Sequence, residues 1–414
     1  MTSRELATSL NMIAEPYVKL VLAVGQHDAD YVDAYYGPAE WQAEAKAVVQ
    51  PLEMILKAAV QLHTELGELR NKRAEEILQL RHQYLKKQLS SLIARVEVLS
   101  GKKLSFDEEA KAYYDVEPPV FTEEHFRNLV GELETILPGK GSIPDRVEDF
   151  RKQFTITPDK IDKVFNAAIF ECRQRTKDHI FLPENETFRL EYVHNKTWSG
   201  YNWYKGNNES LIQINTDLPI FLERAIDLAA HEGYPGHHVY NCLLETTFAR
   251  KFGWVEFTVY PLFSSQSLIA EGTANYGIEV AFPGKERMEF ERDKLFPLAG
   301  LDKSQAENYS RVQELSAKLS YAGNEAARRY LNGDMSRDEA AHWLVQYALM
   351  SPERAQQRTR FFDQYRSYVI NYNFGLDLVQ QYIERRGGTE KYPAKRWEEF
   401  TRLLASPRLP SGLL

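Results

Sequence analysis

The sequence predicts a mainly helical fold, a large helical single domain with a small antiparallel β-sheet beside a central cleft. Apolar residues recur at helical spacing through most of the 414 residues. One region, 188–215, instead alternates apolar and polar residues as a strand does. The proline and glycine breaks near residues 118 and 138 are too short for domain linkers. We therefore expect a helical N-terminal half, 1–180, continuous with a second half, 188–414.

The composition is that of an ordinary globular protein, with 43% hydrophobic and 27% charged residues. The net charge of −8 comes without a basic block, so we expect no nucleic-acid partner. No apolar run reaches about 18 residues and the N-terminus lacks a signal-peptide pattern, so we expect no membrane partner and a cytoplasmic location. Cys172 and Cys242 are expected to be small buried side chains rather than a disulfide.

The longest predicted helix covers residues 68–100, roughly 50 Å at the usual rise per residue. Leucine recurs there every seven residues, at positions 78, 85, 92 and 99, and Gly101 can end the helix. Such a stripe can form a zipper-like homodimer, or it can pack against the preceding helical segment, 51–65, of the same chain. Three heptads are short for a coiled coil, so we favour packing within the chain.

Further helices are predicted at 106–115, 122–137, 144–154 and 158–178. Two strands are predicted at 188–193 and 211–215, and helical periodicity returns after the second of them. Between the strands lie four aromatic residues that either line a substrate cleft or cover the small sheet: Trp198, Tyr201, Trp203 and Tyr204. The sheet leads into a largely apolar helical run at 220–230.

This helical run ends in the most informative segment of the chain, His231-Glu-Gly-Tyr-Pro-Gly-His-His238, which holds three of the ten histidines. Imidazole suits divalent metals such as zinc, and a neighbouring carboxylate, here Glu232, can take a proton from water activated by the metal. The metallopeptidase signature has two histidines four residues apart on one helix. In this chain the next histidine, His237, follows His231 by six residues instead of four.

The late histidine constrains the backbone. On a regular helix, His231 and His237 would point about 240° apart, and His231 and His238 would lie about 10 Å apart along the axis. Neither pair could bind one metal ion on a straight helix. The helix must therefore be distorted, and the glycines and proline of 233–236 permit this. A bulge there favours His237 over His238 as the second ligand, and His238 would then support a ligand or face the substrate.

A third ligand is expected from another helix, and Glu271 is the best candidate. The chain between His237 and Glu271 is long enough for an intervening helix to turn back. Asn275 lies one turn after Glu271 on the same face, where it can accept a hydrogen bond from a ligating imidazole. Glu279 is the other acidic candidate, and we expect it to be a structural partner.

The pattern His-Glu-x-x-Pro-Gly-His-His followed by Glu-Gly-x-Ala resembles the Domain of Unknown Function 885 family of bacterial proteins over roughly residues 190–385. That family is predominantly helical and is similar to gluzincin metallopeptidases. The resemblance implies one Zn²⁺ ion bound by His231, His237 and Glu271, with Glu232 in the general-base position. The second motif departs from the family pattern, because Thr273 stands where tryptophan is commoner.

Family members also tend to carry a late Tyr-x-x-Gly element after an arginine. Tyr372 to Gly375 matches this element, with Arg360 upstream. By hypothesis, Glu232 takes a proton from water and passes it to the leaving amine, Tyr372 donates to the oxyanion, and Arg360 binds a substrate carboxylate.

These residues favour a zinc metallopeptidase or amidohydrolase that acts on short peptides or other amides. The alternative is a non-catalytic helical protein, either a metal-binding protein or a scaffold, derived from a peptidase fold. The metal content of the purified protein would separate the two classes.

Overall fold

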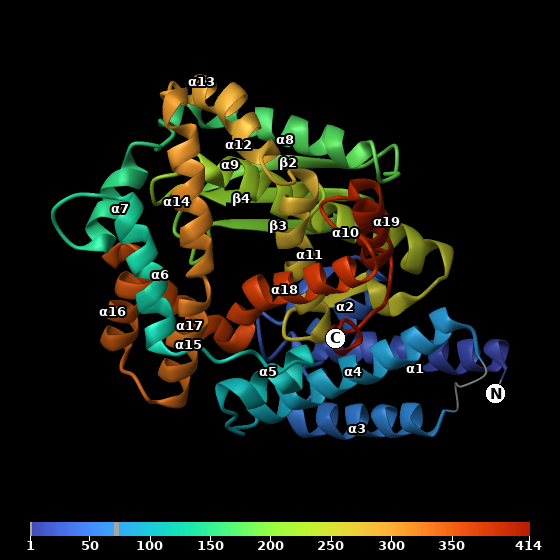
Figure 1. Ribbon diagram of the computed structural model, residues 1–414. Helices are drawn as coiled ribbons and strands as arrows, with labels where there is room; N and C mark the ends of the chain where they lie inside the picture. The colour runs from blue at the N-terminus through green and yellow to red at the C-terminus, as the bar shows by residue number, and fades with distance from the viewer. Residues whose placement is uncertain (1, 70–73) are drawn as a thin grey trace.

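The computed structural model describes residues 2–69 and 74–414. Its N-terminal layer consists of α1 (Ser3–Val24), α3 (Leu52–Glu68) and α4 (Glu76–Leu99), which lie side by side in Figure 1. Leu85, Leu89 and Leu92 are fully buried within the chain, so the leucine stripe packs internally, as we favoured.

The helix predicted over 68–100 begins later than expected, at Glu76. Residue 68 ends α3, and Leu69 already has an extended backbone. Residues 70–73 of the predicted helix lie outside the described residues. The apolar repeat that drives the helix begins only at Leu78, which explains why the helix does not extend to residue 68.

The next four predicted helices are confirmed as α5 (Phe106–Tyr114), α6 (Glu123–Ile136), α7 (Ile143–Lys152) and α8 (Ile161–Lys177). Ser105, Thr122 and Ser142 cap the first three, because each side chain accepts a hydrogen bond from a backbone N–H of the first turn. Cys172 on α8 is buried as a free thiol, and so is Cys242.

A three-stranded sheet follows, made of β2 (Thr187–Val193), β3 (Gly200–Gly206) and β4 (Glu209–Asn215) in the order β2-β4-β3. The predicted small sheet is confirmed, but it is mixed rather than wholly antiparallel. Asn207 and Asn208, both with positive φ, form the tight turn that makes β3 and β4 antiparallel. β4 then fills the place between β3 and β2 and runs parallel to β2.

A second, two-stranded sheet was not predicted. It pairs β1 (Val32–Tyr35) with β5 (Val259–Pro261) in antiparallel fashion. Strands of four and three residues are too short for a recognisable alternation. The pairing matters for the site, because it brings Asp33 of β1 to the central cavity.

The interior is organised around α11 (Ser265–Ala281) and α18 (Ile370–Arg385), which cross near the centre of Figure 1. A Cβ atom on Gly272 would lie 2.4 Å from the carbonyl oxygen of Gly375, so only glycine permits this close approach. The buried apolar side chains form one connected cluster that reaches from Leu6 to Leu413.

The other α-helices flank this interior; their bounds are α2 (Ala39–Ala47), α9 (Glu223–Leu228), α10 (His237–Leu244), α12 (Glu286–Phe290), α13 (Phe296–Ala299), α14 (Ala306–Lys318), α15 (Tyr321–Asn332), α16 (Arg337–Tyr347), α17 (Pro352–Tyr365) and α19 (Pro393–Leu404). Across the described ranges, no helix combines the length and apolar character needed to span a bilayer. The mainly helical fold with a small sheet is thus as the sequence predicts.

Candidate metal centre

The helix that carries His231 is interrupted before His237. After α9 the chain makes one wide π-helical turn (Ala229–Gly233), Tyr234 is extended, and α10 starts at His237. The backbone N–H of Gly236 donates to the carbonyl of Ala230 at 2.9 Å. A Cβ atom on Gly236 would lie only 1.9 Å from the carbonyl oxygen of His231, so glycine is required here. The distortion predicted from the histidine spacing is present.

This break and the packing of α11 against it bring His231, His237 and Glu271 together. The Nε2 atoms of His231 and His237 are 3.1 Å apart, and the Oε2 atom of Glu271 lies 3.2 Å from the first and 3.6 Å from the second. Ligand atoms of a tetrahedral zinc ion, bound at about 2.0–2.1 Å, are separated by about 3.3 Å. The spacing of the three donor atoms is therefore compatible with a tetrahedral zinc ion.

Neighbouring residues hold the second imidazole nitrogen of His231 and the second carboxylate oxygen of Glu271. Nδ1 of His231 lies 2.9 Å from Oδ1 of Asn275, whose amide nitrogen donates to the carbonyl of Tyr372 at 2.8 Å. This bond fixes the tautomer of His231 that keeps a lone pair on Nε2. Tyr368 donates to Oε1 of Glu271 at 2.7 Å, whereas the buried Oε2 atom accepts no hydrogen bond from the described residues.

The charges around the trio favour a cation. Burial opposes protonation of His237, but Glu271, Glu232 and Asp33 outweigh it and raise the pKa of that imidazole to about 9. Burial raises the pKa of Glu271, yet the two imidazoles hold it well below its usual range. Burial raises the pKa of Asp33 to about 6, despite a hydrogen bond from Tyr201. Three carboxyl groups around two imidazoles form a site that a divalent ion could neutralise.

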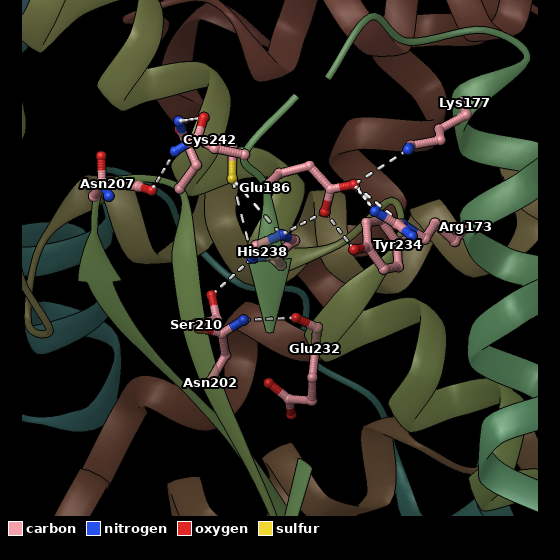
Figure 2. Close-up of polar contacts among 12 residues, drawn as sticks. Arg173, Lys177, Glu186, Asn202, Asn207, Ser210, Glu232, Tyr234, His238 and Cys242 are labelled. Atoms are coloured by element: carbon pink, nitrogen blue, oxygen red, sulfur yellow. Dashed lines mark hydrogen bonds and ion pairs between the residues drawn. The ribbon is translucent and has the colours of Figure 1, made fainter. Parts of the chain in front are cut away.

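Glu232 lines the same cavity as the trio, and its charge contributes to the raised pKa of His237. The residue is 5% exposed, and its backbone carbonyl accepts a hydrogen bond of 2.7 Å from the amide of Asn202 on β3 (Figure 2). A Cβ atom on Gly200 would lie 3.0 Å from Oε1 of Glu232, so a glycine on β3 makes room for the carboxylate.

The cavity has a volume of about 1190 Å³ and reaches from the sheet to α15 and α17. Tyr372 lines it, with its ring centroid 6.5 Å from that of His231. Of the four aromatic residues between the strands, Trp198 and Tyr201 line the cavity. Trp203 and Tyr204 do not, and Tyr204 instead donates a hydrogen bond to buried Glu245.

The structure does not place Arg360 where it could bind a substrate in the cavity, contrary to the sequence prediction. It lies on the exposed face of α17 and does not line the cavity, whereas Arg358 does. Residues two apart on a helix point about 200° apart, so the arginine two positions earlier takes the inward direction. Sequence reasoning also missed Asp33 and Tyr368, neither of which belongs to a recognisable motif.

His238 is neither substrate-facing nor in contact with a candidate ligand. It is fully buried, and its polar neighbours in the described chain are Ser210, Glu186 and the sulfur of Cys242 (Figure 2). Ser210 Oγ lies 2.8 Å from Nδ1 and Glu186 Oε2 lies 3.2 Å from Nε2. Successive residues of a helix point about 100° apart, so His237 faces the cavity while His238 faces the sheet.

Glu186 joins His238 to three further donors. Arg173 and Lys177 of α8 form ion pairs with it, and Tyr234, in the helix break, donates a hydrogen bond to it (Figure 2). Burial raises the pKa of Glu186, but the bonds from His238, Tyr234 and Arg173 outweigh this and hold it at about 2. The network thus ties α8, the break and α10 together behind the candidate ligands.

Glu186→Gln should therefore lower the free energy of unfolding by about 3 kcal/mol at pH 7, because breaking a buried charged network leaves its donors unpaired. In the unfolded chain this carboxyl group titrates near 4.5, above its folded value. Its contribution is present above pH 4.5 and is lost as the pH falls toward 2. Urea unfolding at pH 7, 5 and 3.5 should show a steeper loss for the wild type than for the variant. Equal pH dependence in the two proteins would contradict this assignment.

No family model and no curated protein sequence matches this chain. Its fold is similar to that of "the putative lipoprotein from Colwellia psychrerythraea", with a TM-score of 0.53 and 14% identity over 87% of this chain. This chain spans only 65% of the length of that protein. At this identity the likeness shows a shared fold alone.

Further solved structures match with TM-scores below 0.5, among them the following two. A "putative lipoprotein of unknown function from Shewanella oneidensis" gives 0.48, with 12% identity over 90% of this chain and 74% of the other. The M32 carboxypeptidase from Deinococcus radiodurans R1 gives 0.45, with 12% identity over 99% of this chain and 93% of the other.

Proposed function

We propose that this protein is a zinc-dependent hydrolase of peptide or other amide bonds, in which His231, His237 and Glu271 bind the ion. The observation that carries the proposal is the convergence of three donor atoms, 3.1 to 3.6 Å apart, at the wall of the 1190 Å³ cavity. The resemblance of the two motifs to gluzincin-like proteins supports the same ligand set. Zinc, when bound, would supply a Lewis acid that polarises the scissile carbonyl and activates water.

Glu232 is the proposed general base. It lines the cavity together with the ligand trio, and its backbone carbonyl accepts a hydrogen bond from Asn202. It would take a proton from the attacking water and deliver it to the nitrogen of the leaving amine, so that the amide bond is cleaved by addition of one water molecule. No other carboxylate of the described chain follows a candidate ligand directly in this way.

Tyr372 is the proposed donor to the oxyanion. Burial, with a further contribution from Glu271, raises its pKa well above the usual tyrosine range, so the hydroxyl stays protonated at neutral pH. Asn275 bonds both to His231 and to the backbone of Tyr372, and thus positions the two residues relative to each other. A donor held in advance near the reacting carbonyl lowers the barrier more than one that must reorient.

The zinc-loaded protein should hydrolyse at least some members of a library of short peptides and aminoacyl amides. Mass spectrometry of the products would detect cleavage. A chelator should abolish it, and added zinc should restore it. Complete resistance of the library to the zinc-loaded protein would overturn the proposed activity, and metal binding without turnover would instead indicate a non-catalytic protein.

A further inference from the structure

The cavity is lined by several cations, and all but one have an oxygen partner in the described chain. Arg224 and Arg287 pair with Asp227, and Lys318 pairs with Glu132. Arg151 and Arg354 donate to backbone carbonyls, at 3.1 and 2.9 Å respectively. Arg358 is the exception.

Within residues 2–69 and 74–414, Arg358 interacts with aromatic rings and has no hydrogen bond or ion pair. Its guanidinium carbon lies 4.5 Å from the ring centroid of Phe361, 5.7 Å from that of Phe362 and 5.8 Å from that of Tyr372. Its Nε atom is buried and makes no hydrogen bond within the described chain. Burial lowers the pKa of this guanidinium, although an arginine side chain keeps its charge.

Packing against aromatic rings does not satisfy the hydrogen-bond donors of the Arg358 guanidinium. Rings attract the guanidinium through its flat faces, whereas its five N–H donors lie in its plane. Arg358 itself is half-buried at the cavity wall; its Nε atom is the buried donor, and the guanidinium has no counter-charge within the described chain. A carboxylate is the partner whose two oxygens match the planar fork of donors. The arginine is therefore suited to an anion that enters the cavity from outside the chain.

We propose that Arg358 binds the C-terminal carboxylate of a short peptide, so that the proposed hydrolase removes residues from the carboxyl end. The inference rests on the proposed function and names its substrate class. Tyr372 lies near both parts of the site, because its ring centroid is 5.8 Å from the guanidinium carbon of Arg358 and 6.5 Å from the ring centroid of His231. Consecutive Cα atoms of a peptide are about 3.8 Å apart, so a peptide of a few residues can reach from Arg358 to the candidate ligands.

Three acetylated peptides of matched sequence test the proposal on the zinc-loaded protein. The first peptide ends in a free C-terminal carboxylate, and the second ends in a C-terminal amide. The third also ends in a C-terminal amide, but its last residue is glutamate, so its carboxylate is on the side chain. The free acid should exceed the plain amide in kcat/KM by about 100-fold, the size expected for a charge-assisted bidentate contact. Arg358→Gln should bring that ratio close to one, and Arg358→Lys should restore part of it. Arg360→Gln, on the exposed face of the same helix, is the matched control and should keep the ratio of the wild type.

Binding gives a second readout that does not require turnover. Calorimetry on the zinc-loaded Glu232→Gln variant, which leaves the peptide intact, should show that the free acid binds about 100-fold more tightly than the amide, and that adding Arg358→Gln removes this preference. Circular dichroism and thermal melting would check the fold of each variant.

Equal cleavage of acid and amide by the wild type, or equal binding of the two in the calorimetry, would overturn the inference while leaving the hydrolase intact. An Arg358-dependent preference for the glutamate peptide over the free acid would also overturn it. Absence of all cleavage would overturn the proposed function, and binding would then decide the role of Arg358 independently.

Discussion

Replacing Glu232 by glutamine should lower turnover by about 1,000-fold while leaving the zinc content and the fold unchanged. Positioned general acid–base groups contribute about 10²- to 10⁴-fold, and glutamine keeps the size of the side chain but cannot accept a proton. The hydrogen bond from Asn202 reaches the backbone carbonyl of Glu232, so the substitution does not remove it. Steady-state kinetics with metal analysis of the same sample would measure both effects.

Glu314→Gln is a matched control for this prediction. Glu314 also lines the cavity, but it lies on α14, and its hydrogen bond in the described chain comes from Ser310. Its replacement should leave kcat within about 3-fold of the wild type, the usual scale for a substitution of about 0.5 kcal/mol or less. Undiminished turnover in zinc-loaded Glu232→Gln would eliminate Glu232 as the base.

His237→Ala and His238→Ala should have opposite effects, although the two residues are adjacent. His237 contributes Nε2 to the candidate ligand trio, so its loss should weaken zinc binding by more than about 100-fold, the upper range for residues that merely support a ligand. His238 is buried against Glu186 and Ser210. Its loss should keep zinc affinity within about 10-fold but lower the free energy of unfolding by about 3 kcal/mol.

Competition with a chromophoric chelator would measure zinc affinity, and urea unfolding would measure stability. The reverse pattern, with zinc binding lost in His238→Ala and retained in His237→Ala, would show that His238, and not His237, is the ligand. This pair of variants therefore decides the alternative that the histidine spacing left open.

The pairing of His231 with His237 could be anticipated from the sequence because the constraint is local. The six-residue spacing of His231 and His237 excludes a regular helix, and the glycines between them permit the break that the structure contains. Asn275 followed from Glu271 by helical spacing alone, and it bonds to His231 as expected. Such inferences need only the geometry of one helix and a short loop.

Other site residues depend on information that is not local. The charged run on α17 does not show which of its arginines points into the cavity. The sequence prediction chose Arg360, which lies on the opposite face of the helix from Arg358. Asp33 reaches the cavity only because a four-residue strand pairs with β5, more than 220 positions later in the chain. The parallel pairing of β2 and β4 likewise depends on which strand fills the central place.

The metal content of the purified wild-type protein tests the central claim most directly. After equilibration with zinc and removal of the excess by dialysis, elemental analysis should find about one zinc ion per chain. The double variant His231→Ala/His237→Ala, examined in the same way, should retain almost none. Absence of zinc from the folded wild type, or equal zinc in the two proteins, would contradict a metal centre at these residues.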